Sequence, residues 1–473
     1  MSDKRKLLKV NAVLNIVKQC CAIIFPLISF PYVSRILGVE AYGKVNFGSS
    51  IISYISLLAG LGVSSYAIRE GARIRDDKEK FKKFADEVFS INIVSTAIAY
   101  MLLILIVLFW GKLKQYKFLI MILSMTVLLT TLGTDWVNAV YEDFMYLTVR
   151  YVLCQSLSVI AVLAFVKSSR DIALYAFFSN LGTILANILN LFYIRKKLHI
   201  NINFTFHMNP KKHLQPIILL FGNMISSMIY LYSDTTMLGI LVGDAAVGYY
   251  TVASKIYSLI KQLINAVSTV LTPRLSYDFK NRTVEKSNSN INDVLGALSI
   301  VVFPIAIGMI CMGRQIVLVI AGEEYVEVYF ALCLLSVALV FSTYACIFIS
   351  VIMLAQRKDK EILVASALSA IVNIILNLIL IPRYSYYAAA FTTLLSEILM
   401  LLMGINYTRN AIKIEIGKYL RLAIIGSVEV WMICYGVKYI LSNDIIELFL
   451  SIVICGVIYG STIGISLLLQ KRE

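Results

Sequence analysis

The residues in this sequence that could do chemistry are charged and polar side chains inside long apolar segments. The stretch 254–267, SKIYSLIKQLINAV, places Lys255 and Lys261 near the middle of such a segment. A lysine at the centre of a membrane helix costs roughly 2.5–3.5 kcal/mol, so it usually faces a cavity or a partner. One helical face carries Lys255, Ser258, Gln262, Asn265 and Thr269. This face predicts a wet, cationic site for an anion with hydroxyl groups, such as a pyrophosphate-linked sugar.

Polar side chains on other apolar segments extend the candidate site. Asp234 would neutralise Lys255 or a nearby arginine, or bind a coupling cation; a structural ion pair is the alternative. Arg35 would guide an anion outward or anchor its helix. Arg69 and Arg274 end equivalent helices and are candidate gates, or else topology determinants only. Snorkelling of the lysines towards the interface is the alternative to a cavity. The predicted substrate-binding residues are Asn15, Lys18, Arg35, Asp234, Lys255, Ser258, Lys261 and Gln262.

Two glutamates, the histidines and the cysteines are the remaining residues that could bind an ion. Glu397 and Glu429 lie near the middle of apolar segments and either pair locally or bind a proton or sodium ion; the sequence leaves this open. The three histidines fall in one polar loop, and the eight cysteines lie in apolar segments without a C-x-x-C motif. We therefore predict no metal site and no cofactor apart from a coupling Na⁺ or H⁺. The sequence lacks a Walker loop, which excludes ATP hydrolysis through that motif.

Composition identifies the elements that must position these residues. The chain has 473 residues, of which 59% are hydrophobic and 15% charged. A soluble domain needs roughly a quarter charged residues. About fourteen apolar segments of some 20 residues each predict transmembrane helices, and hence an all-α polytopic membrane protein. The net charge of +15 does not indicate nucleic-acid binding, because Lys and Arg concentrate in alternate loops. That bias predicts that both termini are cytoplasmic.

An internal repeat predicts how the helices are grouped. Residues 38–69 align with 243–274 at an offset of 205 residues, with nine identities in 32 positions, including Gly38/Gly243. Six segments separate the copies, so the halves are parallel repeats, an arrangement found in secondary transporters with the substrate site between the halves. The predicted domains are a six-helix lobe at 1–212, a second six-helix lobe at 213–410 and an extra helix pair at 411–473.

Part of the first repeat resembles a known family. Residues 30–77 comprise FPYVSRILGVEAYGKVNFGSSIISYISLLAGLGVSSYAIREGARIRDD. This stretch is similar to the N-terminal signature of the O-antigen-type repeat-unit flippases of the multidrug/oligosaccharidyl-lipid/polysaccharide (MOP) exporter superfamily. The resemblance implies a MATE-like fold and a central cationic cavity. It also implies that an undecaprenyl-pyrophosphate-linked glycan is moved to the outer leaflet by alternating access, driven by an ion gradient or the membrane potential. Onto that cavity it places Lys18, Asp234, Lys255 and Lys261, with Arg69 and Arg274 as gates.

Four functional classes remain to be compared. A flippase for surface polysaccharide such as O-antigen or capsule is the leading hypothesis. A lipid II flippase is the nearest alternative, and the helix pair after residue 419 resembles the one that helps such flippases form a groove for the lipid tail. A multidrug cation antiporter would need a carboxylate-rich cavity, and a membrane-bound glycan polymerase or ligase a large external loop. We predict a transporter rather than an enzyme, in the bacterial cytoplasmic membrane, with membrane lipids and polysaccharide polymerase machinery as partners.

Overall fold

The computed structural model describes residues 2–281, 284–409 and 413–470, and the regular elements in these ranges are helices. Ten of the described helices are long and apolar enough to cross a membrane, or eleven if one bent pair forms a single span. Hydrocarbon offers no partners to backbone N–H and C=O groups, so each segment satisfies them internally as a helix. The chain is therefore an all-α, multi-pass membrane protein. The count of fourteen spans stays a prediction.

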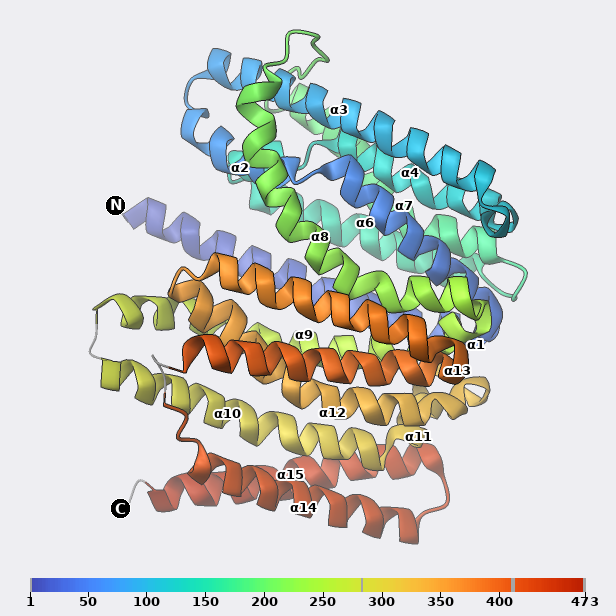
Figure 1. The fold of residues 1–473 in the computed structure, drawn as a ribbon, viewed down its shortest axis with the longest axis vertical. Helices are drawn as coiled ribbons and strands as arrows, with labels where there is room; N and C mark the ends of the chain where they lie inside the picture. The colour runs from blue at the N-terminus through green and yellow to red at the C-terminus, as the bar shows by residue number, and fades with distance from the viewer. Residues whose placement is uncertain (1, 282–283, 410–412, 471–473) are drawn as a thin grey trace. The chain divides into compact units, whose positions relative to one another are not determined.

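The chain divides into two compact units, Met1–Thr236 and Met237–Glu473, while the domain boundaries at 212 and 410 stay predictions. In the first unit, α1 packs along α3, α4 and α6, and α7 packs against α4 and α6 (Figure 1). Its elements are α1 (Ser2–Gly60), α2 (Val63–Ile74), α3 (Lys78–Phe109), η1 (Gly111–Tyr116), α4 (Lys117–Gly133), α5 (Trp136–Val140), α6 (Phe144–Phe165), α7 (Ile172–Lys196) and most of α8 (Pro210–Leu241).

The 59-residue helix α1 folds back on itself at Gly38. The rings of Phe30 and Tyr42 are stacked with centroids 6.0 Å apart. Twelve residues of straight helix would separate them by about 18 Å. Gly38 makes the break with φ 74°, and its repeat partner Gly243 has φ 141° just before α9. L side chains rarely adopt these angles, so the repeat preserves glycine where each half needs a turn before its second helix.

The second unit is built around α12, which packs against α9, α10 and α13. The C-terminal helices are attached through α14, which packs against both α10 and α15. The elements of this unit are α9 (Asp244–Asn281), α10 (Val284–Cys311), α11 (Gly313–Ala321), η2 (Glu323–Val328), α12 (Tyr329–Cys346), the π-helical turn η3 (Ile347–Met353), α13 (Asp359–Thr408), α14 (Gly417–Ile440) and α15 (Asp444–Gln470).

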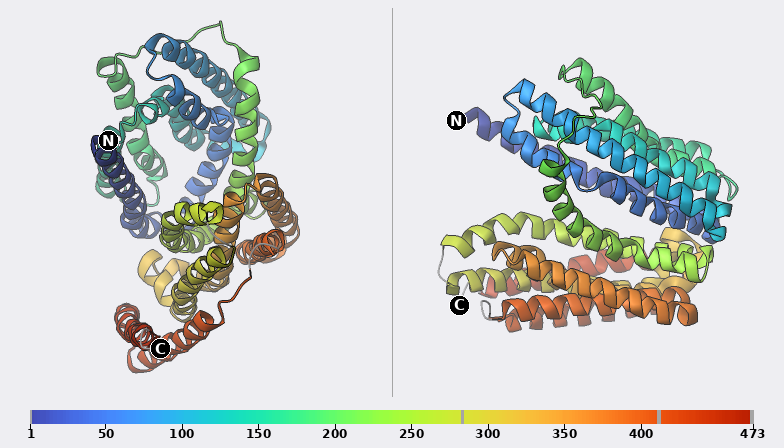
Figure 2. Two further views of the ribbon diagram at one scale, coloured as in Figure 1. Left: turned by 90° about the vertical axis from the view of Figure 1, so that its left-hand side faces the viewer. Right: turned by 45° about the horizontal axis from the view of Figure 1, so that its top comes forward.

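Helix α13 is also two helices, joined at Ser385, whose φ is 53°. The Thr392 hydroxyl donates to the Asn377 side-chain oxygen at 2.6 Å, and the Ser369 hydroxyl donates to the Ser396 carbonyl at 2.9 Å. These partners straddle residue 385, so the two parts run antiparallel, as the orange segments in Figure 2 show. The hydrogen bonds join the two parts where lipid offers no alternative partner.

Small residues allow the C-terminal helices to approach the rest of their unit closely. A Cβ atom at Gly426 on α14 would overlap the ring of Tyr459 on α15. Tyr459 in turn donates its hydroxyl to the Ile300 carbonyl of α10 at 2.5 Å. One tyrosine therefore links α15 to α14 by close packing and to α10 by a hydrogen bond.

We expect Gly426→Val to lower the thermal midpoint of the purified protein, because the added side chain displaces Tyr459; overpacking costs roughly 1–3 kcal/mol. Gly436→Val is the matched control on the same helix, since among the described residues nothing lies within 4 Å of a Cβ placed there. The measurement is a melting curve of each variant in detergent. Equal midpoints for the two variants would contradict the close packing of Tyr459 on α14.

Candidate functional site

The predicted polar face of α9 lies in the second unit, and its residues differ in exposure. Lys255 and Ser258 are half-buried, whereas Gln262 is exposed. Helix α9 packs against α10, α12 and α13, so one side of it is covered within its own unit. Lys261 lies about 120° around the helix from Lys255, which turns it towards a different neighbour.

Lys261 is paired with Glu397 of α13. Its Nζ lies 2.5 Å from Glu397 Oε1. The hydroxyl of Tyr257 donates to the same carboxylate oxygen at 2.9 Å and accepts from Lys261 Nζ at 3.2 Å. The ammonium also lies 5.4 Å from the centroid of the Tyr257 ring. The sequence predicts Lys261 as a site residue and leaves the role of Glu397 open. The fold pairs the two side chains directly, and Tyr257, one turn before the lysine, bonds to both.

A lysine and a glutamate enclosed between packed helices stabilise each other's charge. Each ion alone would carry a large desolvation penalty, and mutual attraction offsets that penalty only when geometry and extra hydrogen bonds are good. The carboxylate is deeply covered, with a side-chain exposure of 4%, while that of Lys261 is 23%. The pair is therefore asymmetric: the cation is the more accessible partner.

Hydroxyl groups join α9 and α13 next to the pair. Tyr250 and Thr393 approach within 3.2 Å through their hydroxyls, one turn of α13 before Glu397. Thr393 also donates to the Ala389 carbonyl at 2.9 Å. A rigid α9–α13 seam is what holds a carboxylate at a fixed position opposite Lys261.

The predicted residues of the first unit occupy separate positions. Lys18 Nζ on α1 lies 5.5 Å from the centroid of the Tyr151 ring on α6. Arg35 is exposed, and Asp234 on α8 is buried, with 7% exposure. Arg69 on α2 pairs with its neighbour Glu70, Nε to Oε1 3.0 Å, and its side chain is half exposed. The roles predicted for these residues stay predictions, as does the pairing of Asp234 with Lys255, because these two belong to different units. Asn15 and Arg274 lie on α1 and α9, but their side chains are outside the described part of the structure.

A buried polar triad in the first unit was not predicted from the sequence. His213, at the start of α8, is fully buried and lies between Glu87 of α3 and Tyr66 of α2. Its Nε2 is 2.7 Å from Glu87 Oε2, and its Nδ1 is 2.7 Å from the Tyr66 hydroxyl. A histidine in a polar loop gave no signal of such partners, which come from positions far apart in the chain. The triad therefore joins α2, α3 and α8. Among the described residues no group of three or more His, Cys, Asp or Glu side chains that could hold a metal ion is found.

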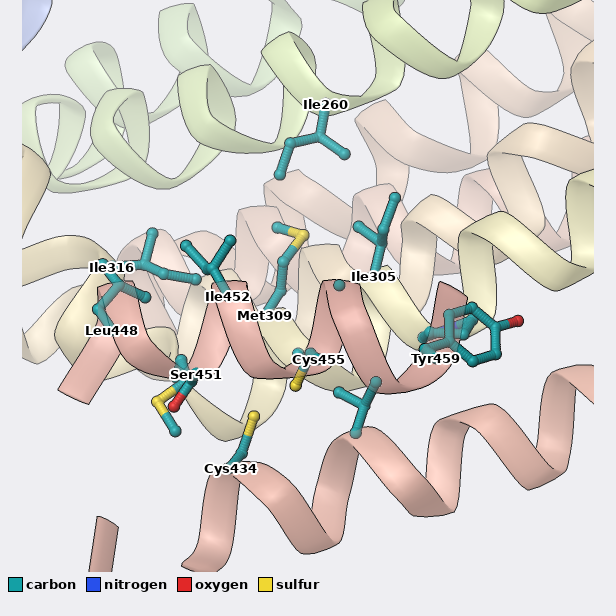
Figure 3. A pocket seen from close by; sticks show the side chains of 15 residues that line it. Ile260, Ile305, Met309, Ile316, Cys434, Leu448, Ser451, Ile452, Cys455 and Tyr459 are labelled. Carbon is teal, nitrogen blue, oxygen red and sulfur yellow. The ribbon is translucent and has the colours of Figure 1, made fainter. Parts of the chain in front are cut away.

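A second missed feature is an apolar cavity of about 340 Å³ beside the C-terminal helices (Figure 3). Its walls come from α9, α10, α11, α14 and α15. Ile260, Ile305, Met309 and Ile452 face the cavity, and Ser451 and Tyr459 also line it. Its size is in the range of small-molecule sites, roughly 300–1,000 Å³. An apolar lining of this kind suits a hydrocarbon chain.

The ion pair makes a testable contribution to stability. We expect Glu397→Leu to lower the thermal midpoint, because it leaves Lys261 as a half-buried cation without its carboxylate; breaking a buried pair costs roughly 3–5 kcal/mol. The double variant Lys261→Met/Glu397→Leu should recover most of this loss, since an apolar pair needs no partner. Melting curves in one detergent compare the three proteins. A double variant no more stable than Glu397→Leu would argue against the pairing.

Comparisons with known proteins identify relatives of this chain. Residues 8–277 match the model of the family described as "Polysaccharide biosynthesis protein". A "Putative O-antigen transporter" of Shigella dysenteriae is 22% identical over 406 residues, covering 84% of this chain and 98% of the relative. A protein of the same name from Escherichia coli K12 is 22% identical over 418 residues, covering 87% and 99%.

Solved structures show the same fold. A lipid II flippase, MurJ in an inward closed conformation, superposes with a TM-score of 0.77 at 18% identity, covering 97% of this chain and all of the flippase chain. An inward-facing multidrug resistance MATE transporter of the MOP superfamily gives 0.63 at 14% identity, covering 84% and 97%. The solved structures confirm the predicted fold. The predicted transporter class agrees with the names of the relatives. With more than half of its residues matched by the family model, the chain belongs to the polysaccharide biosynthesis protein family.

Proposed function

We propose that the protein is a flippase that moves undecaprenyl-pyrophosphate-linked oligosaccharide repeat units from the cytoplasmic to the outer leaflet by alternating access, for surface polysaccharide biosynthesis. Its relatives are named as O-antigen transporters along nearly their whole length. A repeat unit on a polyprenyl carrier combines an anion, a hydroxyl-rich head and a long apolar tail. Each part has a chemical counterpart in this chain.

The observation that carries the proposal is the pair of lysines on α9. Lys255 and Lys261 place two ammonium groups on α9, a segment that the sequence predicts to cross the membrane, where each charge is costly unless it faces a partner or a ligand. Pyrophosphate oxygens are strong acceptors for ammonium donors. Ser258 and the exposed Gln262 on the same helix supply the hydrogen-bonding groups that a sugar needs. Lys18, Arg35 and Asn15 are the candidate partners from the first unit.

We assign part of the polyprenyl tail to the cavity beside α14 and α15. Its walls are almost wholly aliphatic, and its helices are those that resemble the extra pair of lipid II flippases. Ile260 of α9 also lines it, three residues beyond Tyr257 and next to Lys261 in sequence. One helix therefore supplies both a wall of the tail cavity and the cations proposed for the pyrophosphate.

The remaining assignments follow from charge distribution. Lys and Arg concentrate in alternate loops, which supports cytoplasmic termini in a bacterial inner membrane. Arg69 and Arg274 are candidate gates on the cytoplasmic side, although neither ends its helix as the sequence predicted: Arg69 lies within α2 and Arg274 within the continuous helix α9. Na⁺ or H⁺ coupling would use a carboxylate such as Asp234 or Glu429. The polymerase machinery that consumes the repeat unit is the expected partner on the outer side.

Two rival functions are weaker. A solved lipid II flippase shares the fold, but at 18% sequence identity this likeness supports a common fold and not a common substrate. A multidrug cation antiporter would favour free carboxylates, whereas Glu397 is occupied by Lys261. The basic face of α9 therefore favours an anionic lipid over a cationic drug.

We expect the purified protein in liposomes to move a labelled undecaprenyl-pyrophosphate oligosaccharide between leaflets, measured with an impermeant glycan-cleaving enzyme. Lys255→Gln should lower the initial rate about tenfold or more, because a charge-assisted contact to the pyrophosphate is lost. Lys44→Gln is the control, since this lysine pairs with Glu40 at 3.1 Å and lies outside the proposed site.

Protein-dependent flipping with a slow Lys255 variant and a normal Lys44 variant would support the assignment. Failure to flip several such lipids, together with ion-coupled efflux of small organic cations, would replace it with the antiporter function. A normal rate for Lys255→Gln would remove Lys255 from the site.

The tail cavity gives a second prediction. Gly456→Leu projects a side chain into the cavity without a clash, since among the described residues nothing lies within 4 Å of a Cβ there. Gly436→Leu, equally uncrowded but outside the cavity, is its control. We expect Gly456→Leu to slow flipping of the undecaprenyl lipid but not of an analogue with a short prenyl tail. Equal slowing of both lipids would contradict a tail site.

A further inference from the structure

We propose that Glu397 is a built-in competitor of the substrate: its carboxylate occupies Lys261 in the empty protein and is displaced when the pyrophosphate binds. This inference rests on the proposed function and adds a role for a residue outside the predicted substrate-binding set. Glu397 acts through Lys261 and is thus a positioning residue for the cation. The geometry of three side chains on α9 and α13 carries the argument.

The first step is the asymmetry of the pair. The side chain of Glu397 is 4% exposed and that of Lys261 is 23% exposed, although the two atoms lie 2.5 Å apart. An anion arriving from the accessible side meets the ammonium before the carboxylate. Ser258 precedes Lys261 by three positions and therefore lies on the same side of the helix, one turn away. A ligand that reaches Lys261 also reaches this hydroxyl.

The second step is the fate of the displaced carboxylate. A buried carboxylate that loses its only donor is costly. Tyr257 also donates to Glu397 Oε1, at 2.9 Å, and is itself buried. Glu397 thus keeps a hydrogen-bond donor when Lys261 turns to the ligand, which lowers the free-energy cost of the exchange.

The third step concerns why an ion pair is present at all. Stability alone does not require one, because apolar residues of similar volume often pack as well or better than a buried pair. A carrier, in contrast, must bind its cargo strongly enough to load and weakly enough to release it. A carboxylate that competes for Lys261 lowers the affinity of any anion at this position, because the anion must replace the Coulomb attraction between Lys261 and Glu397. Glu397 therefore favours release.

The test measures affinity and turnover in the same variants. Undecaprenyl pyrophosphate is bound to the full-length protein in detergent micelles, and flipping is measured in liposomes at saturating lipid. We expect Glu397→Gln to lower the Kd about tenfold and to lower the saturated flipping rate, because the cation is no longer shared and release becomes slow. Lys261→Met should raise the Kd. Glu447→Gln is the matched control, since Glu447 is as buried as Glu397 but its Oε1 accepts from Gln315 at 3.0 Å.

The outcomes separate this inference from the proposed function. A purely structural ion pair predicts that Glu397→Gln changes the melting temperature but leaves the Kd unchanged; that result, or a higher Kd, overturns the inference while flipping by the unaltered protein preserves the function. No binding and no flipping by the unaltered protein overturns both. If Glu397→Gln is not recovered as folded protein, Glu397→Asp decides, because the shorter carboxylate competes less well. A lower Kd for this variant supports the exchange, and an equal or higher Kd contradicts it.

Discussion

A membrane interior offers no water, and this single constraint shapes the rest of the structure. Backbone groups must be satisfied within their own segments, which is why the apolar stretches are helices. Side-chain polar groups must find partners on neighbouring helices, as Asn377 and Thr392 do across the break in α13. Charges need the strongest partners, and Lys261 with Glu397 is the clearest case. Because few other partners are available, a ligand that binds one member of such a pair can displace the other.

The second unit brings three kinds of chemistry onto one helix. Helix α9 presents lysines, pairs with a carboxylate of α13, and contributes Ile260 to the apolar cavity beside α15. The proposed cargo is amphiphilic in the same way: its sugar and pyrophosphate are polar, and its tail is a hydrocarbon. Charge and apolar surface lie a few residues apart because successive residues of a helix point to different sides. A site built on a rigid helix also holds its groups more accurately than one built on loops.

Small residues and polar triads serve as joints between helices. Gly426 admits the ring of Tyr459, and His213 connects Tyr66 with Glu87. In the first unit this triad ties the start of α8 to α2 and α3. In the second, Tyr459 ties α15 to α10. Both joints depend on one side chain with partners on two other helices, which limits the arrangements that each unit can adopt.

The sequence by itself determined the class of fold, because apolar length and loop charge report directly on membrane helices. It also determined the repeat: Gly38 and Gly243 both adopt positive φ where each half turns. It identified Lys261 as exceptional, since a charge in an apolar segment is visible without a structure. Only the tertiary structure decided its partner. Glu397 is 136 residues away, and no local periodicity links them. Burial of His213 and the cavity beside α14 were equally hidden, because packing between distant helices leaves no pattern within either one.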